Sequence, residues 1–131
     1  MTTPVYEAWK PIEGLPRVLY VEALHDDYEG LRVLLRPNDS SSRMLRIVFE
    51  SVVGYMNVNE GYRQRTWGSI PSMETLPTML TVRDSKWVEW LMEDAGGVLS
   101  KDELIHFAIY TPEDCIDVVT AFPPQVHWLG A

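Results

Sequence analysis

Three residues near the C-terminal end of the chain have side chains that could carry out chemistry: His106, Tyr110 and Cys115. A cysteine is a nucleophile when a histidine beside it holds it as the thiolate, and His106 is the histidine nearest to Cys115 in the sequence. Residues 104–110 alternate like a strand, and antiparallel pairing with the next segment would bring the two side chains together. One hypothesis is therefore a small enzyme or ligand-binding domain with a pocket near His106, Tyr110 and Cys115.

The residues around Cys115 argue against a thiolate. Asp114 and Asp117 flank it, and negative charges raise the pKa of a nearby thiol. A small buried cysteine is the simpler interpretation. No residue is therefore assigned a catalytic role, and the simpler expectation is that the protein is not an enzyme.

Other motifs for catalysis or cofactor binding are absent from the sequence. No Gly-x-Ser-x-Gly, Gly-x-Gly-x-x-Gly or Gly-Lys-Ser/Thr motif occurs. The histidines His25, His106 and His127 lack the paired spacing that is typical of zinc ligands. The sequence predicts no metal and no cofactor.

The net charge of −8 lies almost entirely in the second half of the chain. Residues 1–65 contain eight basic and nine acidic residues, a net charge of −1, whereas residues 66–131 contain three and ten, a net charge of −7. This balance excludes the basic composition of a nucleic-acid-binding protein. It indicates either a solvated surface or a patch for a basic partner protein, because opposite potentials speed association and orient the two proteins.

Trp90 is the main candidate for an interface residue. It lies off the apolar face of a predicted helix, and an exposed tryptophan often anchors a protein interface. Glu93 and Asp94 fall in the last turn of that helix, where the helix dipole disfavours negative charge. The predicted partner-binding residues are Trp90, Glu93, Asp94, Asp102, Glu103, Glu113 and Asp114.

The elements that must position these residues are mostly strands. Asp84 or Ser85 as the N-cap and Gly96-Gly97 as the stop predict a helix over about 85–95. Short connections between strands favour antiparallel pairing. The predicted fold is α+β, a curved antiparallel β-sheet of about six to seven strands with one main helix. Runs of β-branched and aromatic residues predict strands at 17–24, 31–36, 44–49, 52–58, 79–82, 104–110 and 116–119.

A length of 131 residues predicts a single domain, 1–131. Prolines predict an extended lead-in over 1–16 and a loose C-terminal tail over 121–131. Turn-forming residues predict a turn over 25–30 and a short helical turn over 111–114. A single cysteine, no secretory leader and no apolar run of about 20 residues predict a cytoplasmic protein that does not span a membrane.

The segment HFAIYTPEDCIDVV at His106–Val119, with LRIVFE at Leu45–Glu50 and the later Glu60, resembles a group of small bacterial proteins of unknown function. The resemblance carries no assigned activity. In its size and acidity the chain is also similar to immunity proteins, which neutralise bacterial toxins, and this analogy implies a module that binds a basic toxin domain. A homodimer formed through a sheet edge is a third hypothesis.

Overall fold

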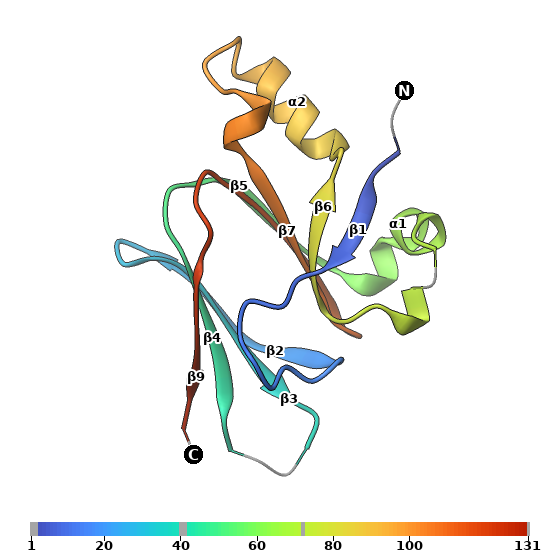
Figure 1. The fold of residues 1–131 in the computed structure, drawn as a ribbon, viewed down its shortest axis with the longest axis vertical. Coiled ribbons are helices and arrows are strands. Elements are labelled where there is room, and N and C mark those ends of the chain that lie inside the picture. The colour runs from blue at the N-terminus through green and yellow to red at the C-terminus, as the bar shows by residue number, and fades with distance from the viewer. Residues whose placement is uncertain (1–2, 40–41, 72, 131) are drawn as a thin grey trace.

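The computed structural model describes residues 3–39, 42–71 and 73–130 of the chain. Within these residues, nine strands form two antiparallel sheets that do not close into a barrel, and two helices and three short 3-10 turns complete the fold (Figure 1). The α+β class and the antiparallel pairing are confirmed. The prediction of one sheet with six to seven strands is wrong, because the strands divide between two sheets and two more strands lie near the chain ends.

The first sheet has four strands, with one face in the core and the other outside it. Burial alternates residue by residue along its two central strands, which is the two-residue period of a strand covered on one side. In order across the sheet, the strands are β2 (Leu19–Asp27), β3 (Gly30–Pro37), β4 (Met44–Phe49) and β9 (Gln125–Leu129).

The second sheet has five strands and is covered on both faces at its centre. Almost every residue of β7 and β8 is buried, which explains why most residues of these segments are apolar. In order across the sheet, the strands are β1 (Val5–Ala8), β6 (Met79–Arg83), β7 (Ile105–Tyr110), β8 (Asp114–Thr120) and β5 (Val52–Asn59).

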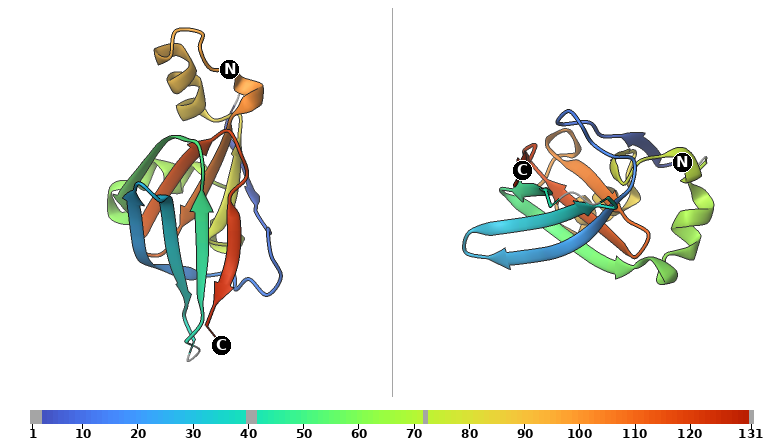
Figure 2. Two further views of the ribbon diagram at one scale, coloured as in Figure 1. Left: turned by 90° about the vertical axis from the view of Figure 1, so that its left-hand side faces the viewer. Right: turned by 90° about the horizontal axis from the view of Figure 1, so that it is seen from below.

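The two sheets pack face to face around the main hydrophobic core. Figure 2 shows the four-stranded sheet in front of the five-stranded one. Phe49 of β4 and Phe107 of β7 meet in this core, with ring centroids 5.8 Å apart. Burying each such side chain contributes roughly 1.5–3 kcal/mol. The buried residues of this core are Leu19, Leu31, Val33, Leu35, Leu45, Ile47, Phe49, Met79, Phe107, Ile109, Ile116 and Val118.

A smaller apolar layer covers the outer face of the five-stranded sheet. There Tyr110 and Cys115 pack in a cluster with Ile70. The covering segment contains η1 (Glu60–Tyr62), α1 (Gln64–Ser69) and η2 (Met73–Thr75). Trp67 of α1 contacts Tyr110 edge-on, with ring centroids 5.8 Å apart. This covering segment and the sheet beneath it together form the candidate site.

Both chain ends are more regular than predicted. The lead-in expected over 1–16 contains β1, which pairs with β6, and the tail expected to be loose over 121–131 contains β9, which pairs with β4. The Trp128 ring lies 3.9 Å from the Arg43 guanidinium, and its Nε1–H donates to the carbonyl of Glu13. These tertiary contacts outweigh the prolines in the two segments.

The turn predicted over 25–30 is shorter in the structure. β2 continues through Asp27 and β3 begins at Gly30, so only two residues connect them. The Asp27 carboxylate accepts hydrogen bonds from Arg32 and from the Glu29 amide, and these close the turn. His25 therefore lies in a strand, opposite Arg32.

The helical turn predicted over 111–114 does not form. The Thr111 hydroxyl accepts hydrogen bonds from the amides of Glu113 and Asp114, and the Thr111 amide donates to the carbonyl of Asp114. These bonds make a tight turn between β7 and β8. A threonine hydroxyl can accept hydrogen bonds from the amides of a turn just as it can from the first amides of a helix, and here it forms the turn.

The main helix, α2 (Lys86–Asp94), agrees with the helix predicted over about 85–95. Ser85 is its N-cap, and Val88 is its only buried residue. Figure 2 shows α2 extending beyond the ends of both sheets, and η3 (Lys101–Glu103) contacts it. No helix in the described part of the chain is long and apolar enough to cross a membrane.

Candidate functional site

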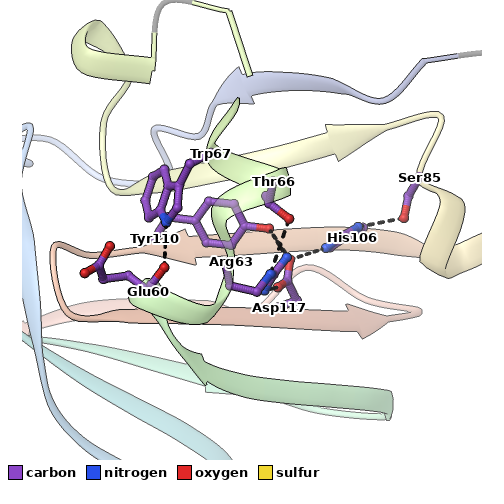
Figure 3. Close-up of polar contacts among 8 residues, drawn as sticks. All are labelled: Glu60, Arg63, Thr66, Trp67, Ser85, His106, Tyr110 and Asp117. Carbon is purple, nitrogen blue, oxygen red and sulfur yellow. Dashed lines mark hydrogen bonds and ion pairs between the residues drawn. The ribbon is translucent and has the colours of Figure 1, made fainter. Parts of the chain in front are cut away.

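A buried carboxylate, Asp117, is at the centre of a polar network on the outer face of the five-stranded sheet (Figure 3). Its side chain is 0% exposed. Oδ1 accepts hydrogen bonds from His106 Nε2 at 2.7 Å and from the Tyr110 hydroxyl at 2.6 Å. Oδ2 accepts one from the Arg63 guanidinium at 2.8 Å. Three donors thus satisfy a charge that would be very costly to bury alone.

Strand register places His106, Tyr110 and Asp117 together. His106 lies opposite Val119, Tyr110 opposite Cys115, and Asp117 opposite Ala108, midway between them. Side chains alternate between the two faces of a strand, so all three point to the outer face. His106 and Tyr110 therefore reach Asp117 diagonally across the pair β7–β8.

Arg63 reaches the network from the layer that covers this face. It lies between η1 and α1, and its Nε–H donates to the Thr66 hydroxyl. Within this layer Trp67 Nε1–H donates to the Glu60 carbonyl, and the Glu60 amide joins the layer to the β7–β8 turn by donating to the Glu113 carbonyl. The guanidinium is thus fixed above Asp117.

Ser85 connects the network to helix α2. Its hydroxyl lies 2.7 Å from His106 Nδ1, and its oxygen accepts the amide hydrogen of Val88. When Nε2–H of a neutral His106 ring donates to Asp117, Nδ1 is left as an acceptor, and Ser85 donates to it. A Ser–His–Asp chain of hydrogen bonds results, in which serine contacts Nδ1 and aspartate contacts Nε2.

The electrostatics of the network favour an ion pair between Asp117 and Arg63. Burial alone raises the pKa of Asp117, but the bonds from His106, Tyr110 and Arg63 outweigh it, so this pKa lies below its ordinary value. Burial alone lowers the pKa of Arg63, but Asp117 outweighs it, and this pKa is raised. Burial and the nearby carboxylate raise the pKa of Tyr110, which stays protonated and donates.

A cavity of about 300 Å³ opens beside the network. Arg63, Ser85, His106, Tyr110 and Asp117 all contribute to its lining. Within the described residues, each buried side-chain nitrogen or oxygen has a hydrogen-bond partner. The same part of the chain has no cluster of three or more His, Cys, Asp or Glu residues that could hold a metal ion.

No protein-family model, curated protein or solved structure matches the chain. The resemblance of residues 106–119 to small bacterial proteins stays a prediction. What the chain does has to be inferred from its own residues.

The structure brings together two of the three residues predicted for the pocket. His106 and Tyr110 line the cavity, whereas Cys115 packs in the apolar cluster beneath α1. Cys115 lies opposite Tyr110, four residues along β7 from His106, which is about 13 Å at the rise of a strand. Burial raises the pKa of the Cys115 thiol to about 12, so the thiol is protonated at neutral pH.

The predicted acidic residues fall at two ends of the molecule. Glu93 and Asp94 end α2, beside Asp102 and Glu103 of η3. These four residues precede β7 in the chain, whereas Glu113 and Asp114 follow it. Six residues of strand, about 20 Å, separate the two groups, so they do not form one patch.

Sequence reasoning missed Arg63, Ser85 and Asp117 as members of one site. A local signal existed for Asp117, a charged residue within the otherwise apolar strand segment Ile116–Val119. A buried charge on such a strand needs partners. No pattern in the sequence around Arg63 or Ser85 indicated the site. Arg63 reaches Asp117, and Ser85 reaches His106, only through tertiary packing.

Proposed function

We propose that the protein is a cytoplasmic protein-binding module that neutralises a basic partner, in the manner of an immunity protein. The surface that supports this proposal is the α2 surface, which we define as Trp90, Glu93, Asp94, Val98, Asp102 and Glu103. The observation that carries the proposal is Trp90, whose side chain is 56% exposed on a helix that extends beyond the sheets.

Exposed apolar side chains on the α2 surface fit an interface. Val98, just after the helix, is 84% exposed. Burying Trp90 and Val98 against a partner would remove apolar area from water, and tryptophan is enriched among residues that dominate binding energy. Trp87 and Val88 hold the first turn of α2 in place, through a ring contact with His106 and through burial respectively. The partner would therefore meet a helix anchored at one end.

Charge indicates the chemistry of the partner. Residues 84–103 contain six acidic and two basic residues, a net charge of −4. A basic surface would complement this charge, with carboxylates forming a polar rim around an apolar centre. Glu113 and Asp114, at the other end of β7, do not belong to this surface.

The test begins with the wild-type chain immobilised and exposed to a native lysate of the source organism. The captured protein is identified, purified and titrated against the wild type, Trp90→Ala and the double variant Glu93→Lys/Asp94→Lys. We expect Trp90→Ala to weaken binding by about 30-fold, the loss typical of a central interface tryptophan. The charge reversal should slow association, and raising the salt concentration should slow association of the wild type.

Matched controls separate this surface from non-specific adsorption. Tyr28→Ala removes another exposed aromatic side chain, on the β2–β3 turn, and Glu113→Lys reverses a charge at the far end of β7. Both controls should bind the partner like the wild type. Equal binding by Trp90→Ala and the wild type, or an acidic partner, would contradict the proposal.

The cavity beside Asp117 favours a second candidate function, a small enzyme or ligand-binding domain. The specific observation is that His106 and Tyr110 line this cavity with Ser85. A serine hydroxyl that donates to histidine is the arrangement of a nucleophile and its base, although the Ser85 oxygen also caps α2.

Labelling separates the enzyme from the ligand-binding domain. Phenylmethanesulfonyl fluoride reacts with activated serines, and the modified residue is located by peptide mass spectrometry. Modification of Ser85 that is lost in His106→Gln supports an enzyme. Absence of modification, together with binding of a small molecule in the cavity, supports the ligand-binding domain.

A further inference from the structure

We infer that the cavity beside Asp117 binds a small organic anion, with the anionic group at Arg65 and Lys86 and the apolar part between Tyr6, Met56 and Trp87. This inference rests on the second candidate function, in which the cavity is a ligand site. It is independent of protein binding by the α2 surface.

The lining of the cavity carries an excess of positive charge. Among the described residues it includes Arg63, Arg65 and Lys86, with Asp117 as the one carboxylate. Arg63 already pairs with Asp117 at 2.8 Å, and the pair neutralises itself. Arg65 and Lys86 are exposed at the cavity, and within the described residues neither side chain forms an ion pair or a hydrogen bond. The cavity therefore presents two cations without partners.

This positive site contrasts with the rest of the molecule. The chain has a net charge of −8, and residues 66–131, which contribute Lys86, have a net charge of −7. Two unpaired cations at one cavity in such a chain would attract a small anion, while the surrounding negative charge would disfavour large polyanions such as nucleic acids.

Helix α2 adds to the attraction for an anion. Ser85, Lys86 and Trp87 line the cavity and form the start of this nine-residue helix. The Ser85 oxygen already accepts the Val88 amide of this first turn, and the helix dipole is positive at this end. The dipole favours a negative group next to Lys86.

The remaining walls favour a ligand with an apolar part. Tyr6, Met56 and Trp87 are all half-buried and line the cavity. The volume of about 300 Å³ equals roughly ten water molecules at about 30 Å³ each. A single aromatic or short aliphatic body with one carboxylate or phosphate group fits this space.

The experiment titrates the purified full-length chain with benzoate, phenyl phosphate, inorganic phosphate and neutral benzyl alcohol, followed by calorimetry and by nuclear magnetic resonance shifts of the Trp87 indole N–H. We expect both organic anions to bind and to shift that signal. Benzyl alcohol should bind at least about tenfold more weakly, because it lacks the charge that Arg65 and Lys86 recognise. Inorganic phosphate should also bind more weakly, because it lacks the apolar body.

Variants locate the site. Arg65→Ala and Lys86→Ala should each weaken anion binding by about fivefold or more, whereas Lys10→Ala, which removes an exposed cation outside the cavity, should not. Equal affinity for benzyl alcohol and benzoate, or unchanged binding by both cavity variants, would overturn the anion inference and leave a ligand cavity. Failure of every probe to bind the folded chain would overturn the anion inference, whereas modification of Ser85 by phenylmethanesulfonyl fluoride tests the second candidate function separately. Neither outcome bears on the α2 surface.

Discussion

His106 Nε2 lies 2.7 Å from Oδ1 of Asp117, although the two residues are not directly opposite each other on β7 and β8. This diagonal bond fixes the histidine ring between Asp117 and Ser85. Through Arg63 the same carboxylate also holds the start of α1. The buried carboxylate of Asp117 therefore links α1 and α2 to β7 and β8 of the five-stranded sheet. It thereby fixes the positions of the cavity walls relative to one another.

Substituting Asp117→Asn should destabilise the fold strongly. The amide keeps the size of the side chain but removes the negative charge, so Arg63 stays buried in part without its counterion. Breaking one side of a buried ion pair costs about 3–5 kcal/mol, and we expect a loss of this size in the free energy of unfolding measured with urea. Asp102→Asn, at an exposed position in η3, should change it by less than about 0.5 kcal/mol. A loss below about 1 kcal/mol for Asp117→Asn would show that the ion pair does not stabilise the fold.

The contribution of Asp117 to stability should disappear in acid. Its pKa in the folded state lies below its ordinary value, and the unfolded value is about 3.9. The stabilisation is therefore fully present above about pH 4 and is lost as the pH falls through the lower, folded-state pKa. Urea unfolding of wild type and Asp117→Asn between pH 7 and pH 2 should give a difference that is constant at neutral pH and shrinks below about pH 4.

The difference between the two proteins is the quantity to measure, because Asp27 also has a lowered pKa, about 2. The loss of stability in acid, if measured on the wild type alone, would combine the contributions of Asp27 and Asp117. Asp27→Asn serves as the control, since it removes the contribution of Asp27 and leaves Asp117 intact. A gap between wild type and Asp117→Asn that persists unchanged at pH 2 would contradict the assignment.

Cys115 should be unreactive in the folded protein. Burial raises the pKa of its thiol to about 12, whereas an unfolded cysteine has a pKa of about 8.5. At pH 8 a disulfide reagent such as dithionitrobenzoate should label the denatured chain within minutes and the folded chain only as fast as it opens. Because the folded pKa is the higher one, this burial stabilises the fold below about pH 8.5, and that stabilisation is lost as the pH rises towards 12. Rapid labelling of the folded chain would place Cys115 in an accessible site.

Local sequence patterns identified most of the elements but not their arrangement. The helix near 85–95 has a cap and a glycine stop within its own sequence, and the strands at 44–49 and 79–82 contain enough β-branched residues to be recognised alone. β1 and β9 have only four and five residues. Their stability comes from pairing with β6 and β4, and this tertiary pairing leaves little trace in so short a segment.

The candidate site was predicted only in part for the same reason. His106 and Tyr110 share a strand and a face, so their spacing was sufficient to group them. Cys115 shares that face too, but register places it at the far end of the strand pair from His106. Arg63 is 54 residues from Asp117 along the chain. An ion pair over such a separation is set by how α1 packs, which no pattern around Arg63 reveals.

The hairpin β2–β3 offers a test of backbone geometry with a matched control. Gly30 has a φ of 101°, and a Cβ atom there would lie 3.2 Å from the carbonyl oxygen of Phe49. A residue with a side chain would be strained by this backbone conformation and crowded by this carbonyl oxygen. Gly30→Ala should therefore lower the free energy of unfolding by about 1–3 kcal/mol. Gly68 lies in α1 with open space around its Cβ position, and Gly68→Ala should raise stability by about 0.5–1 kcal/mol, because alanine loses less backbone entropy in a helix. Urea unfolding of the two variants should therefore shift in opposite directions. A shift in the same direction would mean that either the two-residue turn or the helical conformation of Gly68 is absent in solution, and amide hydrogen exchange at Glu29 and Gly68 would show which one.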